Sequence, residues 1–107
     1  GEDAFRVENA QAWLSLCAEV AWEPRLARLQ SIFHSRMHSN LMSGFNKLRG
    51  RSEADRLSLS MSAFIDGLWI RLGIGDKEMT SAVALSLARD QLKRSLPELA
   101  NGSLTGE

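Results

Sequence analysis

The sequence is poor in several features that define large protein classes: it has one cysteine, no tyrosine, two prolines and no net charge. The lone cysteine, Cys17, cannot form an internal disulfide, and we expect a buried thiol in a protein of the reducing cytoplasm. The 13 basic residues are matched by 13 acidic ones, whereas nucleic-acid-binding domains usually show a basic excess. This segment is therefore not expected to bind DNA or RNA by itself.

Targeting features are missing as well. The sequence has no uninterrupted apolar run approaching the roughly 18 residues that a membrane-spanning helix requires, so no membrane partner is predicted. The first residues, GEDAF, are acidic and lack an apolar core, which argues against a secretory signal. We therefore expect a cytoplasmic protein.

Helical periodicity is the strongest feature that is present. Hydrophobic residues make up 44% of the 107 residues and recur at three- and four-residue spacing, which predicts helices and fits a single domain. The helices are expected at about residues 7–22, 24–48, 53–72 and 81–95. Pro24 separates the first two, because the residue before a proline is pushed out of helical geometry. The predicted fold is all-α, with a domain over residues 1–97 and a tail of disordered composition over residues 98–107.

The predicted third helix has two apolar faces instead of one. Bulky residues form the first face, which suits the core: Leu57, Met61, Phe64, Leu68 and Leu72. The second face has small residues at its centre and consists of Leu59, Ala63, Gly67, Ile70 and Ile74. A helix that is apolar nearly all round must be covered on more than one side. Gly67 costs roughly 1 kcal/mol relative to alanine inside a helix, which close packing of another helix would explain. Gly73 and Gly75 are predicted to end this helix.

The predicted fourth helix carries a similar surplus of apolar surface. Its core stripe is Leu85, Ala88, Leu92 and Leu96, and a second patch lies near its start. The third and fourth helices of two copies would together form an intermolecular four-helix bundle, which predicts a symmetric homodimer. The candidate interface residues are Leu59, Ala63, Gly67, Ile70, Ile74, Val83, Ala84 and Leu87.

The sequence offers little for catalysis or metal binding. His34 and His38 share one side of the second helix, a spacing that can bind a metal, but no third ligand is obvious. They are better interpreted as partly exposed, solvated histidines, and no metal, cofactor or catalytic residue is predicted. Asp66 is the only carboxylate inside the apolar third helix, and we interpret it as an interface carboxylate paired with an arginine.

Aromatic residues provide the one candidate ligand site. Trp13 and Trp69 lie toward the edges of apolar faces, with Phe33 on a facing helix. Aromatic rings around a cavity hold a quaternary ammonium by cation–π attraction, worth roughly 0.5–2 kcal/mol per ring. Plain core packing is the competing interpretation, since aromatic residues at helical spacing are usually core. The candidate ligand-binding residues are Trp13, Cys17, Phe33, Met37 and Trp69.

Several runs of residues resemble the C-terminal domain of TetR-type transcriptional regulators, and most of all the BetI subgroup, the repressors of choline-to-glycine-betaine genes. The runs are AWL at 12–14, WEPRLARLQ at 22–30, SNLMSGF at 39–45, FIDGLWIRLGIG at 64–75 and DKEMTSAVALSLARDQLKRSLP at 76–97. The resemblance covers about residues 7–97. The IDGLW run is characteristic of this type of domain but does not single out BetI.

The resemblance implies a homodimer whose last two helices form an intermolecular four-helix bundle, with a small-molecule pocket among the preceding helices. It also implies that operator DNA is bound only by an N-terminal helix-turn-helix domain, which this sequence lacks. The expected function is effector sensing and dimerisation, with choline or a related quaternary ammonium as the candidate effector. Two other hypotheses are a helical protein-interaction adaptor without a small-molecule ligand and, last, a metal-dependent enzyme using His34 and His38.

Overall fold

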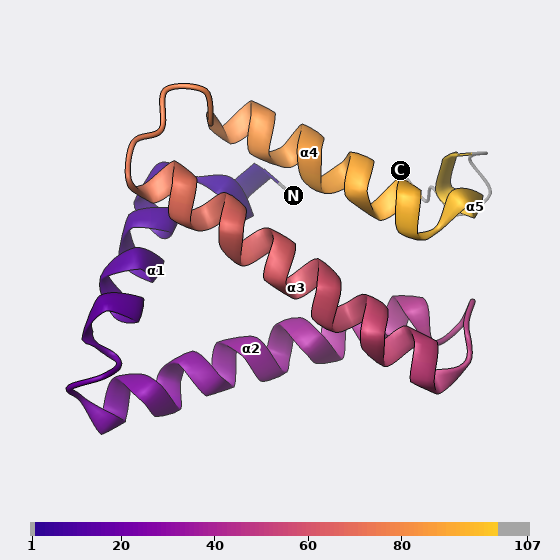
Figure 1. The fold of residues 1–107 in the computed structure, drawn as a ribbon, viewed down its shortest axis with the longest axis horizontal. Helices are drawn as coiled ribbons and strands as arrows, with labels where there is room; N and C mark the ends of the chain where they lie inside the picture. Colours follow the sequence, from indigo (N-terminus) through magenta and orange to yellow (C-terminus); the bar gives the residue numbers. More distant parts are fainter. Residues whose placement is uncertain (1, 101–107) are drawn as a thin grey trace.

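The computed structural model describes residues 2–100, and these residues form helices and no strand. The elements in chain order are η1 (Glu2–Phe5), α1 (Val7–Glu19), α2 (Pro24–Phe45), α3 (Arg51–Gly73), α4 (Ser81–Ser95) and α5 (Pro97–Ala100) (Figure 1). The all-α prediction is confirmed. The predicted tail begins inside α5, and its residues 101–107 lie outside the described part of the chain. No helix within residues 2–100 is long and apolar enough to cross a membrane.

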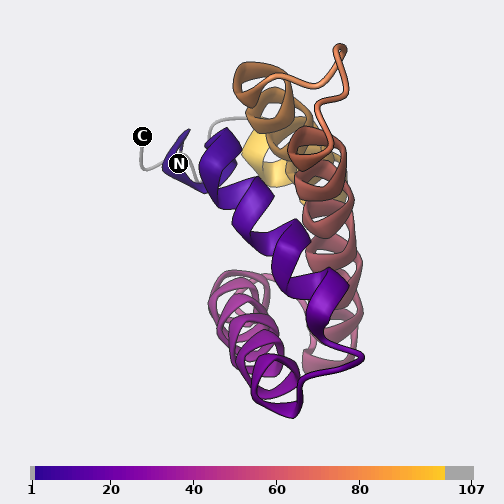
Figure 2. The same cartoon turned by 90° about the vertical axis from the view of Figure 1, so that its left-hand side faces the viewer.

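Helix α3 is the centre of the arrangement, because α1, α2 and α4 each contact it. Figure 1 shows α4 on one side of α3 and α2 on the other, with α1 beside the C-terminal end of α3. Figure 2 shows the same helices along a perpendicular view, in which α1 again runs next to α3. A side chain on α3 can therefore face α1, α2, α4 or solvent, depending on its position around the helix.

The helix boundaries follow local signals with some differences. Glu23 is the N-cap of α2 and accepts a hydrogen bond from the Arg25 backbone N–H, with Pro24 in the first turn. Thr80 caps α4 by accepting from the Val83 N–H. The structure ends α1 at Glu19 and α2 at Phe45, each earlier than predicted, and it begins α3 at Arg51, slightly before the expected start.

The two glycines at the end of α3 have different roles. Gly75 adopts a positive φ of 80°, which glycine tolerates best and which turns the chain toward α4. Gly73 is the last residue of α3, and a Cβ there would lie 2.9 Å from the Ala10 carbonyl oxygen. Gly73 therefore permits the close approach of α1 to α3, a role that its position before a turn does not reveal.

The core forms where α3 meets its neighbours. From the bulky face of α3, Met61, Leu68 and Leu72 are buried, and Leu57 and Phe64 are half-buried against the same cluster. The other buried members of this cluster are Phe5, Ala10, Phe45, Ala54, Met79, Ala84, Ala88 and Leu96. Ala84 was predicted to face a second copy, but it is 0% exposed because α4 packs on α3 and η1. Its side chain belongs to the protomer core.

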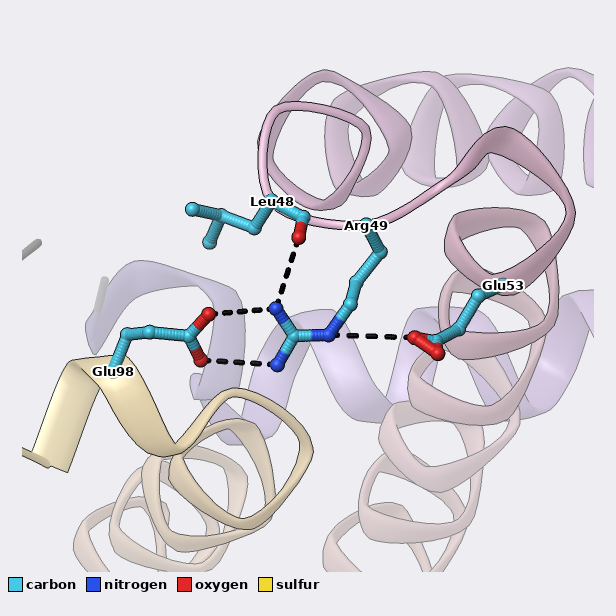
Figure 3. Close-up of polar contacts among 4 residues, drawn as sticks. All are labelled: Leu48, Arg49, Glu53 and Glu98. Carbon is cyan, nitrogen blue, oxygen red and sulfur yellow. Dashed lines mark hydrogen bonds and ion pairs between the residues drawn. The ribbon is translucent and has the colours of Figure 1, made fainter.

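An ion-pair clamp connects α5 to the turn between α2 and α3. The Arg49 guanidinium donates to both carboxylate oxygens of Glu98, at 2.6 and 3.0 Å, and to the Leu48 carbonyl oxygen at 3.0 Å (Figure 3). Its Nε lies 3.4 Å from Glu53 in the first turn of α3. The hydrogen bonds from Arg49 lower the pKa of Glu98 to about 2, and the same bonds raise the pKa of Arg49. The clamp holds the end of α4–α5 against the start of α3.

Candidate functional site

Three helices bring aromatic side chains together around Trp13. The Trp13 ring centroid lies 5.8 Å from that of Phe33, 5.3 Å from that of His34 and 5.4 Å from that of Trp69, all in edge-to-face geometry. We call these four residues the Trp13 cluster. Trp13 comes from α1, Phe33 and His34 from α2, and Trp69 from α3. The structure therefore unites three of the five predicted ligand-binding residues.

Each of the other three rings of the Trp13 cluster contacts the ring of Trp13. Centroid separations of 5.3–5.8 Å fall in the range of directly packed aromatic pairs, and Trp13 is buried. The indole N–H of Trp69 donates to the Ala4 carbonyl oxygen at 2.8 Å, which ties η1 to α3. In this conformation the other three rings pack on Trp13 and do not surround an empty cage, and Phe33 is 45% exposed.

A groove lies between α2 and α3 beside this cluster and has a volume of about 600 Å³. We call it the α2–α3 groove; its lining is Ala27, Gln30, Ser31, His34, Ser35, His38, Ser39, Leu59, Ser62, Ala63 and Asp66. Most of these side chains carry a hydroxyl, imidazole, amide or carboxyl group. The volume is in the range of small-molecule sites. His34 belongs both to the groove and to the Trp13 cluster, so the two features are adjacent.

Two histidine–carboxylate pairs connect α2 to α3. His34 Nε2 lies 2.9 Å from Asp66 Oδ2, and His38 Nε2 lies 3.0 Å from Asp55 Oδ1. Both histidines are partly exposed, as expected, but each also pairs with a carboxylate, which the sequence did not predict. The expected arginine partner of Asp66 is wrong, because Asp66 pairs with His34; the nearby Arg71 pairs with Asp76 at 2.6 Å. Helices α2 and α3 run antiparallel and pack together, which places these histidines and carboxylates opposite one another across the contact between the two helices.

Asp66 keeps one oxygen without a partner. Its Oδ1 atom is buried, and no donor within the described residues reaches it. The groove therefore has a carboxylate, hydrogen-bonded through one oxygen only, next to aromatic rings. No group of three histidine, cysteine, aspartate or glutamate side chains in the described region could hold a metal ion.

The two remaining predicted ligand residues, Cys17 and Met37, differ in their relation to the groove. Cys17 is half-buried, and its Sγ accepts a hydrogen bond from the Gln30 amide at 3.2 Å. Gln30 in turn lines the groove, so Cys17 is connected to the site through one side chain. Met37 is half-buried on α2 and does not line the groove.

The prediction from sequence missed the polar lining of the groove. Ser31, Ser35 and Ser39 follow one another at four-residue spacing, and His34 and His38 continue the same side of α2. This pattern of hydroxyl and imidazole groups on one helix side was available in the sequence. Its partner residues on α3, chiefly Ser62 and Asp66, required knowledge of how α2 packs.

The second apolar face of α3 is exposed along its length. Leu59 is 68% exposed, Ile74 is 64% exposed, and Ile70 is also exposed. A Cβ built on Gly67 meets nothing within 4 Å, so no packing in the protomer requires glycine at this position. Val83 and Leu87 on α4 are exposed as well. We call the residues Leu59, Ala63, Gly67, Ile70 and Ile74 the exposed α3 face.

Comparison with known proteins agrees with this all-α arrangement. Residues 2–97 match the family described as "BetI-type transcriptional repressor, C-terminal". The chain therefore belongs to this family of TetR-type regulator domains, and the resemblance inferred from its sequence runs is confirmed. The family is one of transcriptional regulators and not of enzymes.

Its relatives include the "HTH-type transcriptional regulator BetI" of Escherichia coli O17:K52:H18 (strain UMN026 / ExPEC) and of Escherichia coli strain SMS-3-5. Each is 36% identical over 97 residues, which cover 89% of this chain and 50% of the relative. The chain thus spans about half the length of the curated relatives it matches. No solved structure matches it.

Proposed function

We propose that this chain is the effector-sensing and homodimerisation domain of a BetI-like transcriptional repressor. The observation that carries the proposal is the exposed α3 face, an apolar surface with a glycine that the protomer does not need. Contiguous apolar surface exposed to water marks interaction sites. Operator DNA would be bound in the cytoplasm by a helix-turn-helix segment outside these 107 residues, in keeping with the "HTH-type" name of its relatives.

Self-association has a direct test. Analytical ultracentrifugation of the purified chain across a concentration series should show a monomer–dimer equilibrium, because burying the exposed α3 face removes apolar area from water. A protein that remains monomeric at high micromolar concentration would contradict the proposal. That result would favour the adaptor hypothesis, in which the same face binds a different protein.

The proposed effector is choline or a related quaternary ammonium. Two observations support a cation: the Trp13 cluster offers aromatic rings, and Asp66 contributes negative charge to the neighbouring groove. Because the rings are packed on one another, a cation would bind at the groove side of the cluster, near His34 and Asp66. Binding inside the present ring contacts would require them to separate.

The charge of Asp66 allows a matched ligand test. Isothermal titration should show that choline binds more tightly than its uncharged dimethylbutanol isostere. Asp66→Asn should weaken choline binding about tenfold, or about 1.4 kcal/mol, and leave the isostere unchanged. Asp55→Asn is the control, since Asp55 also pairs with a histidine but does not line the groove. Equal affinity for both ligands, or equal effects of the two variants, would contradict a cationic effector in this groove.

A further inference from the structure

The α2–α3 groove and the exposed α3 face share residues. Leu59 and Ala63 line the groove, and the same two side chains form the N-terminal half of the exposed face. The groove therefore opens at its edge directly onto that face. Whatever covers the exposed face also covers this edge of the groove.

The edge that the groove shares with the exposed α3 face is more exposed than is usual in a binding site. Leu59 is the most exposed large hydrophobic side chain of α3, at 68%. The opposite wall, on α2, is dominated by serines and histidines. An effector site normally buries most of its ligand, whereas this groove has one side wall that ends in a solvent-exposed leucine. One wall of the groove is missing among the described residues 2–100.

We propose that a second copy of this chain supplies the missing wall, by packing on Leu59 and Ala63, so that the groove becomes a composite site of two protomers. The inference rests on the homodimerisation proposed above. It adds that the second copy extends from Leu59 and Ala63 over the open side of the groove, so that dimerisation encloses the histidines and the effector groove.

The chemistry of the face favours a second copy over a charged partner. Between Arg56 and Arg71 the face carries no charged side chain, and Arg71 is held by Asp76. An isologous interface brings the same patch from both copies together, so an uncharged centre avoids opposing like charges. Ala63 and Gly67 leave room at that centre for the close approach of a helix.

Enclosure by a second copy has a thermodynamic consequence. A molecule bound in the composite groove contacts both protomers, so it must strengthen dimerisation as much as dimerisation strengthens its binding. The effector site and the dimer interface would then be one coupled unit.

The two histidines allow a test that needs no effector. His34 and His38 are the only histidines in the sequence, and both line the groove with side chains about 40% exposed in the protomer. Their carbethoxylation by diethylpyrocarbonate, followed by mass spectrometry on tag-free protein, reports access to the groove. We expect the modification rate to fall severalfold as the protein concentration rises through the dimer dissociation constant.

Two matched variants separate enclosure from other effects of concentration. Gly67→Arg places a charge on the exposed face and should keep the rate near its dilute value at the concentrations where the unchanged chain is protected. Gly44→Arg should retain the protection; both glycines lie inside helices, and a Cβ at either meets nothing within 4 Å. If Gly67→Arg does not fold, the dilution series of the unchanged chain still decides the question.

The outcomes distinguish the composite groove from the homodimerisation on which it rests. A dimer by sedimentation whose histidine modification is independent of concentration overturns the composite groove and leaves homodimerisation standing. Absence of a dimer overturns both. Protection of the histidines in parallel with the dimer fraction, lost in Gly67→Arg and kept in Gly44→Arg, supports the composite groove.

Discussion

The two apolar faces of α3 have opposite surroundings. Leu68 on the bulky face is 5% exposed, and Leu59 on the exposed face is 68% exposed, although both are leucines of one helix. The bulky face is covered by other helices of the same chain, and the other face is left uncovered by the residues that the structure describes. Hydrophobicity along a helix therefore indicates that a face must be buried, but not which chain buries it.

The largest expected effect comes from truncating each face in turn. Leu68→Ala should lower the free energy of unfolding by about 2–5 kcal/mol, because it leaves a cavity in the core. Leu59→Ala makes the same chemical change and should alter the stability of the dilute monomer by only about 0.5 kcal/mol. Urea denaturation at low protein concentration measures both. Equal losses would contradict the division of α3 into an inner and an outer face.

An added charge should affect the outer face next most strongly. Gly67→Arg should raise the dimer dissociation constant about tenfold or more, which corresponds to about 1.4 kcal/mol, since the two-fold axis brings two like charges together. Sedimentation equilibrium measures this constant, with Gly44→Arg as the control. If the control weakens the dimer as much as Gly67→Arg does, the interface lies elsewhere.

The smallest expected effect concerns the ion pair between Arg49 and Glu98, which does not contact the centre of either apolar face of α3. The pKa of Glu98 in the folded protein, about 2, lies below its ordinary value of 4.5. Glu98 therefore stabilises the fold at pH values above 4.5, and this contribution is lost as the pH falls toward about 2. Glu98→Gln should therefore melt slightly below the unchanged chain at neutral pH. The two melting temperatures should converge as acid is added.

Thermal unfolding followed by circular dichroism over this pH range measures the convergence. Glu78→Gln, which changes an exposed carboxylate in the connection between α3 and α4, is the control and should show no such pH dependence. A difference between Glu98→Gln and the unchanged chain that stays constant in acid would show that the carboxylate charge is not the cause. Because Glu98 is partly exposed, solvent screening keeps the effect small.

Local signals explain how much of the fold was predictable. The break before α2 follows from Glu23-Pro24, and the start of α4 follows from Thr80, because both are properties of a few neighbouring residues. The bulky face of α3 was also predictable, since 3.6-residue periodicity needs no knowledge of other helices. The ends of α1 and α2 were harder to predict, because Trp22 and Leu48 continue the apolar pattern beyond the last residue of each helix.

The candidate site was predictable only in part, for a physical reason. Aromatic residues on three helices were recognised as one candidate set, and Trp13, Phe33 and Trp69 do meet. The pairing of His34 with Asp66 joins residues 32 positions apart, and no local pattern determines such a contact. Ala84 shows the same limit, since its burial depends on how closely α4 approaches α3 and η1.

The sequence by itself determined the all-α class, the family and the existence of two apolar faces on the central helix, because propensity, periodicity and motif similarity are local properties. Only the tertiary structure decided which face the protomer covers and where the histidines find their carboxylates. It also showed that the α2–α3 groove runs into the exposed α3 face. Those features depend on the relative placement of distant helices, which is set by packing and not by any one segment.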